Sequence, residues 1–168
     1  MADAFSVSVA TPADNGPVGA LLEASYPALM RDSYDAAVLA AALPAMTKAN
    51  AALLSSGTYY VARSKAGETV GCGGWTHGRP GSGETEPGPA HIRHFATHPD
   101  WTGRGIGRLL YARCEADARA AGARRFECYS SINAEGFYAA LGFETVRRMQ
   151  IPMANGVRIP NVLMQRRI

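Results

Sequence analysis

Alternation of apolar and polar residues along the chain marks its strands. Residues 5–10 (FSVSVA) alternate between apolar and polar side chains, and residues 58–63 and 69–76 look like the two strands of a hairpin around a turn at residues 65–68. Because successive side chains of a strand point to opposite faces, the pattern predicts one strand followed by a β-hairpin. The remaining segments with strand-like patterns are residues 90–98, 124–131, 144–153 and 157–167.

Helical spacing of apolar residues fills the gaps between these strands. The turn and capping residues 11–14 (TPAD) precede a helical pattern at residues 18–30. A second helical stretch covers residues 34–46 and 49–56, and we expect it to break near Pro44 because proline removes a backbone donor. Helices interleaved with mostly sequential strands predict an α/β layered domain.

Length and composition narrow the class of protein. The chain has 168 residues, of which 47% are hydrophobic and 18% charged, so we expect one globular domain over residues 1–168. The longest apolar run, residues 36–46, is too short to span a bilayer, and no basic segment followed by an apolar block indicates secretion. Three widely spaced cysteines (Cys72, Cys114 and Cys128) suit buried thiols in a reducing compartment, so we expect a cytoplasmic protein. The net charge of +3 is not gathered into a basic face interleaved with aromatics, so neither nucleic acid nor a membrane is expected as a partner.

Three glycines at alternate positions form the most informative feature of the chain. Residues 98–122 (HPDWTGRGIGRLLYARCEADARAAG) place Gly103, Gly105 and Gly107 directly before an amphipathic helical pattern that Gly122 closes. Glycine destabilises a helix by up to about 1 kcal/mol relative to alanine, so three at a helix start require a reason. Such a turn presents free backbone N–H groups at the positive end of the helix dipole and lets an anion approach the backbone.

The charge around this turn fits an anion site. Arg104 and Arg108 flank the glycines, so the turn predicts a phosphate or pyrophosphate site, with a tight turn that binds no ligand as the alternative. A nucleotide P-loop is excluded because no lysine follows Gly107, and a G-x-G-x-x-G dinucleotide motif is excluded by the glycine spacing. The remaining pattern is G-x-G-x-G.

The segment HPDWTGRGIGRLL closely resembles the acyl-CoA site of the GNAT superfamily of N-acyltransferases. The family signature Q/R-x-x-G-x-G/A falls here on Thr102, Gly105 and Gly107. A second block, SSINAEGFYAALGF at residues 130–143, is similar to the family's later block and lies in the expected order, so the resemblance covers nearly the whole chain. It implies a GNAT-like fold, a mixed and mostly antiparallel sheet of about six to seven strands flanked by helices, with two central strands splayed apart.

The resemblance also implies acetyl-CoA as the cosubstrate, with no metal. Acetyl-CoA would lie between the splayed strands at residues 91–98 and 124–131. Backbone groups of Phe95, Ala96 and Thr97 would bond the pantetheine amides and polarise the thioester carbonyl. The other cosubstrate contacts that the resemblance implies are Thr102, Gly103, Arg104, Gly105, Ile106, Gly107, Arg108, Ser131, Asn133 and Phe137.

Some of these contacts depart from the family pattern. Thr102 stands where arginine or glutamine is usual, so backbone N–H groups would carry most of the diphosphate binding, with Arg104 or Arg108 compensating. Ser131 stands at a usual asparagine position, and Asn133 two residues later either contacts the pantetheine arm or caps the following helix.

The implied reaction is direct attack of a primary amine on the thioester in a ternary complex. Tyr138, at the family's Phe-Tyr position, would act as general acid toward the departing thiolate, because a phenol with a pKa of about 10 stays protonated at neutral pH. A core tyrosine is the alternative. His91 stands where some members carry a glutamate and would act as general base, with a chain of water molecules as its main rival. Alternation places His94 on the opposite face of the strand from His91, which also argues against a shared metal ion.

The acceptor is expected to be a small amine or a peptide amine, which the sequence leaves unidentified. The resemblance implies that apolar and aromatic residues shape its pocket, with core packing as the alternative for most: Tyr26, Met30, Tyr34, Trp75 and Met149. Glu84 and Glu86, in a Gly/Pro-rich surface loop at residues 78–89, would attract a cationic amine or remain solvated.

A second class of function competes with the enzyme. A non-catalytic acyl-CoA-binding or regulatory module would keep the fold, and Thr102 favours it while Tyr138 disfavours it. Homodimers are common in the superfamily, but the sequence identifies no interface.

Overall fold

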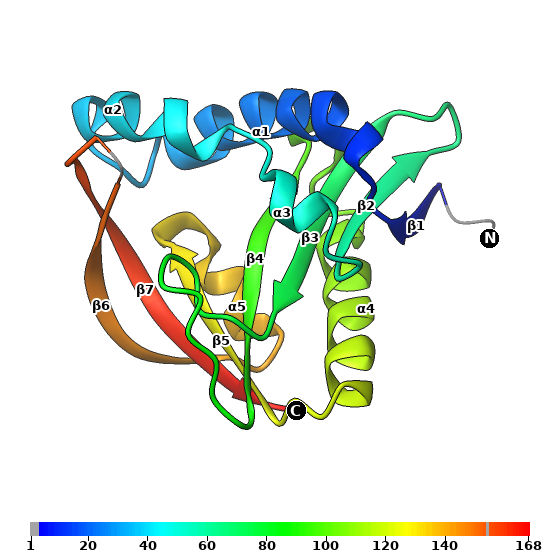
Figure 1. Ribbon diagram of the computed structural model, residues 1–168. Coiled ribbons are helices and arrows are strands. Elements are labelled where there is room, and N and C mark those ends of the chain that lie inside the picture. Colours follow the sequence, from blue (N-terminus) through cyan, green and yellow to red (C-terminus); the bar gives the residue numbers. More distant parts are fainter. Residues whose placement is uncertain (1–3, 154) are drawn as a thin grey trace.

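A single seven-stranded sheet runs through the molecule in the computed structural model, which describes residues 4–153 and 155–168 (Figure 1). Its order is β1-β2-β3-β4-β5-β7-β6, and every neighbouring pair is antiparallel except β4 and β5. The predicted mixed and mostly antiparallel sheet is therefore confirmed. The strands are β1 (Phe5–Val9), β2 (Tyr59–Ser64), β3 (Thr69–Thr76), β4 (Pro89–Thr97), β5 (Arg125–Ser131), β6 (Glu144–Pro152) and β7 (Arg158–Arg167).

Helices cover both faces of the sheet. They are α1 (Asn15–Met30), α2 (Ala36–Met46), α3 (Ala51–Leu54), α4 (Ile106–Ala120) and α5 (Glu135–Ala140), with single 3₁₀ turns at η1 (Pro12–Asp14), η2 (Pro99–Trp101) and η3 (Ile132–Ala134). Strand β2 shows the layering, because Tyr60 and Ala62 pack in the cluster that holds α4, whereas Tyr59 and Val61 pack with α1 and α3. This alternation is the period-two repeat of a strand.

The predicted break near Pro44 is confirmed, because α2 ends at Met46 and α3 begins only at Ala51. Helix α2 continues through Pro44 to Met46, and the chain leaves the helix only at Thr47, whose N–H donates to Leu43 O at 2.9 Å. Pro44 is exposed and lies in the last turn, so the donor that it lacks costs one bond at a solvated helix end. The other end is well capped, since the Asp35 carboxylate accepts from two backbone N–H groups of the first turn.

The N-terminal corner depends on one buried carboxylate. Asp14 is 5% exposed, accepts from Thr11 N–H at 2.9 Å and pairs with the Arg63 guanidinium of β2. The pair ties the start of α1 to the sheet.

Strands β4 and β5 separate after a short contact, and this separation positions the site. They pair only through Pro89–Arg125, Ala90–Phe126 and His91–Glu127, whereas β5 pairs with β7 over its whole length. On its other side, β4 pairs with β3 through a register shift, and His94 at this point has a φ of 51°. The splayed central strands that the family resemblance implied are therefore present.

Candidate active site

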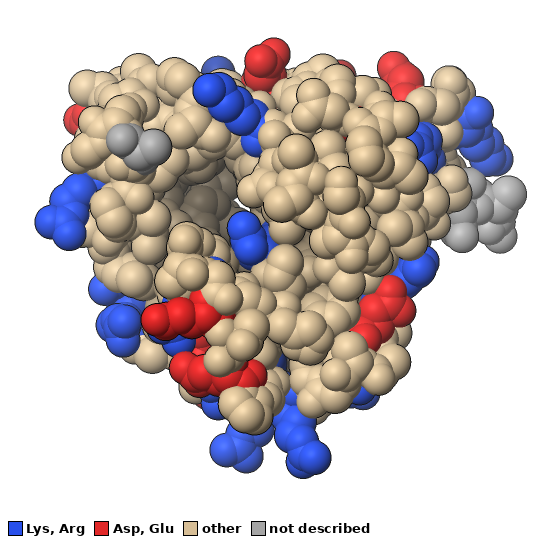
Figure 2. Space-filling view, in the orientation of Figure 1, with Lys and Arg blue, Asp and Glu red and all other residues tan. Residues whose placement is uncertain are grey.

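A cavity of about 630 Å³ lies at the open end of the splayed strands. One part of its wall comes from β4, the glycine turn and α5, and the other part comes from α1, α2, β6 and β7. Figure 2 shows a hollow on this side, below the helices at the top and beside the β6–β7 arm, and its visible wall is mostly uncharged. The predicted catalytic and cosubstrate-binding residues all belong to this lining except His91 and Arg104.

The glycine turn presents a set of free donors to this cavity. Gly103 and Gly105 have φ values of 73° and 86°, which non-glycine residues adopt only with strain. Within the described part of the chain, no backbone N–H group of residues 103–108 donates to a protein acceptor. The first bond of α4 runs from Leu109 N–H to Gly105 O at 3.0 Å. These N–H groups stand at the positive end of a 15-residue helix, which is the arrangement that binds phosphates.

Gly107, the third glycine of the turn, is required for a different reason. A Cβ on Gly107 would lie 2.8 Å from Phe137 Cζ, closer than Cβ atoms approach their neighbours. Gly107 therefore lets α5 pack directly against the start of α4. Gly107 and Phe137 both line the cavity.

The two arginines of the turn separate in the structure. Arg108 lines the cavity, whereas the Arg104 guanidinium stacks on the Trp101 ring, with its Cζ 4.5 Å from the ring centroid. Thr102 also lines the cavity, and its hydroxyl donates to Pro99 O at 3.2 Å. Of the two arginines expected to compensate for Thr102, Arg108 is the one that reaches the site.

Tyr138 lies at the inner end of the cavity and is 5% exposed. Its ring packs against Phe95 of β4, Phe137 and Phe143, with centroid distances of 6.3, 5.0 and 5.4 Å. Burial raises the pKa of Tyr138 well above its ordinary value, and the neighbouring Cys128 thiol adds to the effect. The phenol therefore keeps its proton throughout the physiological range.

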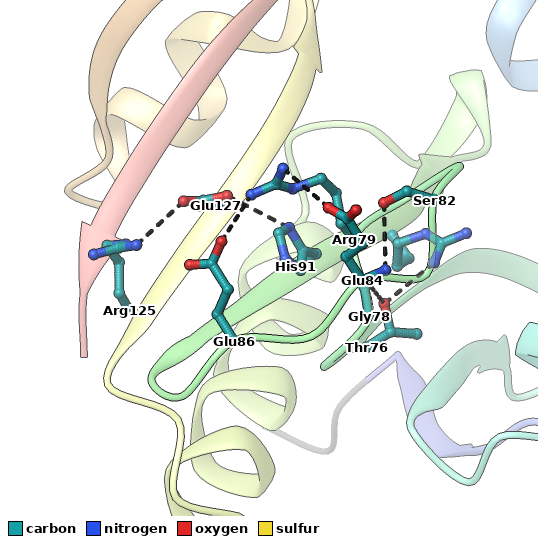
Figure 3. Close-up of polar contacts among 10 residues, drawn as sticks. Thr76, Gly78, Arg79, Ser82, Glu84, Glu86, His91, Arg125 and Glu127 are labelled. Atoms are coloured by element: carbon teal, nitrogen blue, oxygen red, sulfur yellow. Dashed lines mark hydrogen bonds and ion pairs between the residues drawn. The ribbon is translucent and has the colours of Figure 1, made fainter.

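His91 does not reach the cavity. It is 3% exposed and lies where β4 and β5 are still paired, with its Nδ1 3.7 Å from Glu127 Oε2 and without a hydrogen-bond partner. Figure 3 shows His91 between Arg79 and Glu86 of the loop, with a dashed line joining its ring to Glu127. Burial lowers the pKa of His91. The structure thus separates this histidine from the other predicted site residues.

His94, which alternation placed on the opposite face, lines the cavity. The bulge at this residue breaks the alternation, and two tyrosines fix it, because Tyr59 OH donates to His94 O at 2.8 Å and Tyr26 OH donates to Phe95 O at 3.0 Å. The signal that was missed lies on β3, where a Cβ on Gly73 would lie 2.5 Å from the Phe95 ring. A glycine in a strand interior often marks such a bulge or a close approach.

Comparison with known families decides the class of this fold. The model of the GNAT acetyltransferase domain matches residues 31–163. The chain belongs to the GNAT acetyltransferase family. Solved structures agree, and a GCN5-related N-acetyltransferase from Rhodopseudomonas palustris superposes with a TM-score of 0.75 at 26% identity, covering 97% of this chain and 95% of the other.

Two further structures share the GNAT fold at lower identity. The PaiA N-acetyltransferase from Thermoplasma acidophilum, in complex with coenzyme A, has a TM-score of 0.68 at 12% identity and covers 98% of this chain and 99% of its own. N-acetylglutamate synthase from Neisseria gonorrhoeae, complexed with coenzyme A and L-arginine, has a TM-score of 0.65 at 18% identity. That match covers 98% of this chain and 33% of the synthase.

The remaining cosubstrate candidates of this GNAT domain also line the cavity. Phe95, Ala96 and Thr97 line the cavity from β4, and Ser131 and Asn133 line it from the end of β5 and the turn after it. Neither the 3₁₀ turn nor helix α5 has a side-chain cap, so the capping role considered for asparagine is not the one adopted.

The second part of the wall is apolar. Tyr26 and Met30 line it as expected, whereas Trp75 and Met149 do not. Tyr34 supports the wall from behind, because its hydroxyl donates to Pro160 O at 2.7 Å and accepts from Ile132 N–H at 2.8 Å. No aspartate or glutamate is among the lining residues. The two loop glutamates, Glu84 and Glu86, instead pair with Arg79 at 3.8 and 3.3 Å.

The described residues contain neither a disulfide nor a metal-binding cluster. The three cysteines are free and buried, and no group of three or more His, Cys, Asp or Glu side chains in residues 4–153 and 155–168 could hold a metal ion. Within the same residues, no helix combines the length and the hydropathy needed to cross a membrane.

Proposed function

We propose that the protein is an acetyl-CoA-dependent N-acetyltransferase that transfers the acetyl group to a primary amine in a ternary complex. The observation that carries the proposal is the row of free N–H groups of residues 103–108, which opens into a cavity that follows the unpaired part of β4 to Tyr138. Membership of the GNAT family supports it, as do structural neighbours that contain coenzyme A.

The residues present fit coenzyme A. The diphosphate would meet the N–H groups of the glycine turn and the Arg108 guanidinium, so helix dipole and side chain act on the same charge. The pantetheine arm would lie along β4 at Phe95–Thr97, with Ser131 and Asn133 on the opposite wall. When bound, acetyl-CoA supplies an acyl group activated as a thioester, and the protein supplies position and protons.

Tyr138 would serve the leaving group. The amine nitrogen forms a bond to the thioester carbonyl carbon, the carbon–sulfur bond breaks, and the thiolate takes the phenolic proton, which water later replaces. Burial raises the pKa of the Cys128 thiol in the same place to about 12. The CoA thiolate released beside Tyr138 would be a strong base for the same reason. Its raised affinity for a proton would match that of the Tyr138 phenol, whose pKa is also raised.

The acceptor would be an amine with an apolar body. The second part of the cavity wall contains Tyr26, Leu29, Met30, Ile151 and Met153, without a carboxylate that could pair with further cationic groups. A polyamine or an aminoglycoside would leave its additional charges without partners there, which costs several kcal/mol per buried ion. We therefore expect phenethylamine-like substrates to exceed spermidine in kcat/KM.

Two measurements test the proposal. In a thermal-shift comparison, acetyl-CoA should raise the melting temperature while ATP and NAD do not. A ligand at one hundred times its Kd stabilises the folded state by about 2.7 kcal/mol. Release of free CoA thiol is then followed over a panel of apolar amines, amino acids and polyamines. Stabilisation without turnover on any amine would favour the non-catalytic module, and absence of stabilisation by acetyl-CoA would refute the site itself.

A further inference from the structure

The backbone at His94 is held in an unfavourable conformation by its surroundings. Its φ of 51° is the only positive value for a non-glycine residue in the described chain. Such a residue costs of the order of 1–3 kcal/mol and persists only where neighbouring contacts impose it. Here Tyr59 OH holds the His94 carbonyl at 2.8 Å, and Tyr26 OH holds the next carbonyl at 3.0 Å. Strained residues of this kind concentrate at functional sites.

The hydrogen bond of the His94 ring fixes its tautomer. Nε2 lies 3.0 Å from the main-chain oxygen of Met46 in α2. A carbonyl oxygen only accepts, so Nε2 carries the hydrogen and the lone pair of the neutral ring lies on Nδ1. Within the described residues, Nδ1 of His94 has no hydrogen-bond partner, and this atom is not fully buried. The free lone pair is therefore open to the cavity that His94 lines.

The charges around His94 keep this lone pair available. Burial lowers the pKa of His94, and the neighbouring Arg93 guanidinium lowers it further, while the bond to Met46 opposes both. The other titratable groups facing it are Tyr26 of α1, whose ring centroid is 5.9 Å away, and Tyr59 and Cys72, which contact the His94 carbonyl. All three have raised pKa values and stay uncharged at neutral pH. No carboxylate is among the described lining residues, so among these contacts only the bond to Met46 favours the imidazolium, and burial outweighs it.

We propose that His94, through Nδ1, accepts the proton that the amine loses during acetyl transfer. This inference rests on the proposed function. As the nitrogen–carbon bond forms, the amine nitrogen becomes positively charged and gives a proton to Nδ1, while the departing thiolate takes the proton of Tyr138. The imidazolium then passes its proton to solvent in the cavity, and water restores the phenol, so neither proton nor charge is left over.

The test uses a variant that keeps the backbone. Asparagine tolerates positive φ better than other side chains with a Cβ, so His94→Asn removes the base with little added strain. We expect kcat to fall by about 10²–10⁴-fold, the usual range for general base catalysis, while the stabilisation by acetyl-CoA persists. The wild-type pH profile of kcat/KM should fall with slope one on the acid side of an inflection below pH 6.5, and this inflection should vanish in the variant. Dividing the wild-type pH profile by that of His94→Asn removes the contribution of amine ionisation, because both profiles contain it.

Controls separate the outcomes. His77→Asn, at an exposed histidine outside the cavity, should keep the wild-type profile. If His94→Asn fails to fold, His94→Gly removes the strain at φ 51°, and added imidazole should then restore part of the rate. An unchanged profile in either folded variant, or a wild-type profile without the inflection, would overturn the role of His94. Loss of the inflection in His91→Asn alone would transfer the role to that residue. Absence of wild-type turnover would instead count against the proposed function.

Discussion

Substitution of Gly107 by alanine gives the sharpest test of how the glycine turn is built. The new Cβ would lie 2.8 and 2.9 Å from Phe137 Cζ and Cε2, whereas ordinary contacts begin at 3.4 Å, so the ring must retreat by about 0.6 Å. Phe137 cannot move alone, because its ring packs on Tyr138 with the centroids 5.0 Å apart. Overpacking of this kind typically costs 1–3 kcal/mol, and the better helix propensity of alanine returns up to about 1 kcal/mol.

The substitution should therefore affect binding more than folding. We expect the free energy of unfolding to fall by about 0–2 kcal/mol in urea titrations. The Kd for acetyl-CoA should rise about tenfold for each 1.4 kcal/mol by which the displaced ring narrows the site. Isothermal titration with CoA measures the second effect. Gly19→Ala in α1 is the matched control, since a Cβ there meets nothing within 4 Å. It should stabilise the protein by about 0.5–1 kcal/mol without changing the Kd.

A second substitution identifies the cause. Phe137→Leu shortens the obstructing side chain, so in the double variant the alanine should cost less than it does alone, with a coupling energy of about 1 kcal/mol. The reasoning is refuted if Gly107→Ala behaves like Gly19→Ala in both assays, or if the effects of Gly107→Ala and Phe137→Leu simply add.

The remaining predictions concern single side chains. Tyr138→Phe should lower kcat by about 10²-fold or more while the Kd for CoA and the melting temperature stay near wild type, and unchanged turnover would remove the phenol from the mechanism. Tyr34→Phe removes two hydrogen bonds and should destabilise the protein by about 1–2 kcal/mol and raise the KM for the amine rather than for acetyl-CoA. Arg63→Ala should cost about 2 kcal/mol in urea unfolding, more than Asp14→Ala, because it leaves the buried Asp14 carboxylate without its ion-pair partner; the reverse order would contradict this. Because the folded-state pKa of His91 lies below its ordinary value of 6.5, the unfolded chain binds more protons just below pH 6.5. Stability should therefore fall from pH 7.5 to 5.5, and by less in His91→Asn, when urea unfolding is compared at the two pH values.

Local sequence patterns predicted the elements because they depend on local physics. The strands β2 and β3 follow from the hairpin pattern, and α4 follows from one apolar face and a glycine turn at its start. The break near Pro44 follows in the same way, because proline lacks a backbone donor, and α2 ends two residues after it.

The same distinction between local and non-local features applies to the candidate site. Residues of the two contiguous motifs, such as Gly103, Gly105–Arg108 and Tyr138, line the cavity. The histidines were misjudged because their placement depends on pairing between strands. Regular alternation predicted that His91 and His94 face opposite ways, but a bulge at the second residue and continued pairing with β5 at the first decide what each one meets. Neither event has a local signature on β4 itself.

The unpaired strand edges explain why this sheet forms a binding site at all. Strand β5 bonds β7 over its full length but bonds β4 only through its first three residues, so the edge of β5 beyond Glu127 faces the cavity without a strand partner. The β4 edge beyond His91 is in the same state. Buried backbone groups without partners are costly, and beside this gap the Phe95 ring of β4 packs on the Tyr138 ring of α5 with centroids 6.3 Å apart. Two β4 carbonyls beyond His91 accept from Tyr59 and Tyr26, and a linear ligand that carries amides, as pantetheine does, would bond other groups along both edges. The same packing places Tyr138, the proposed general acid, beside the gap in which this ligand would lie.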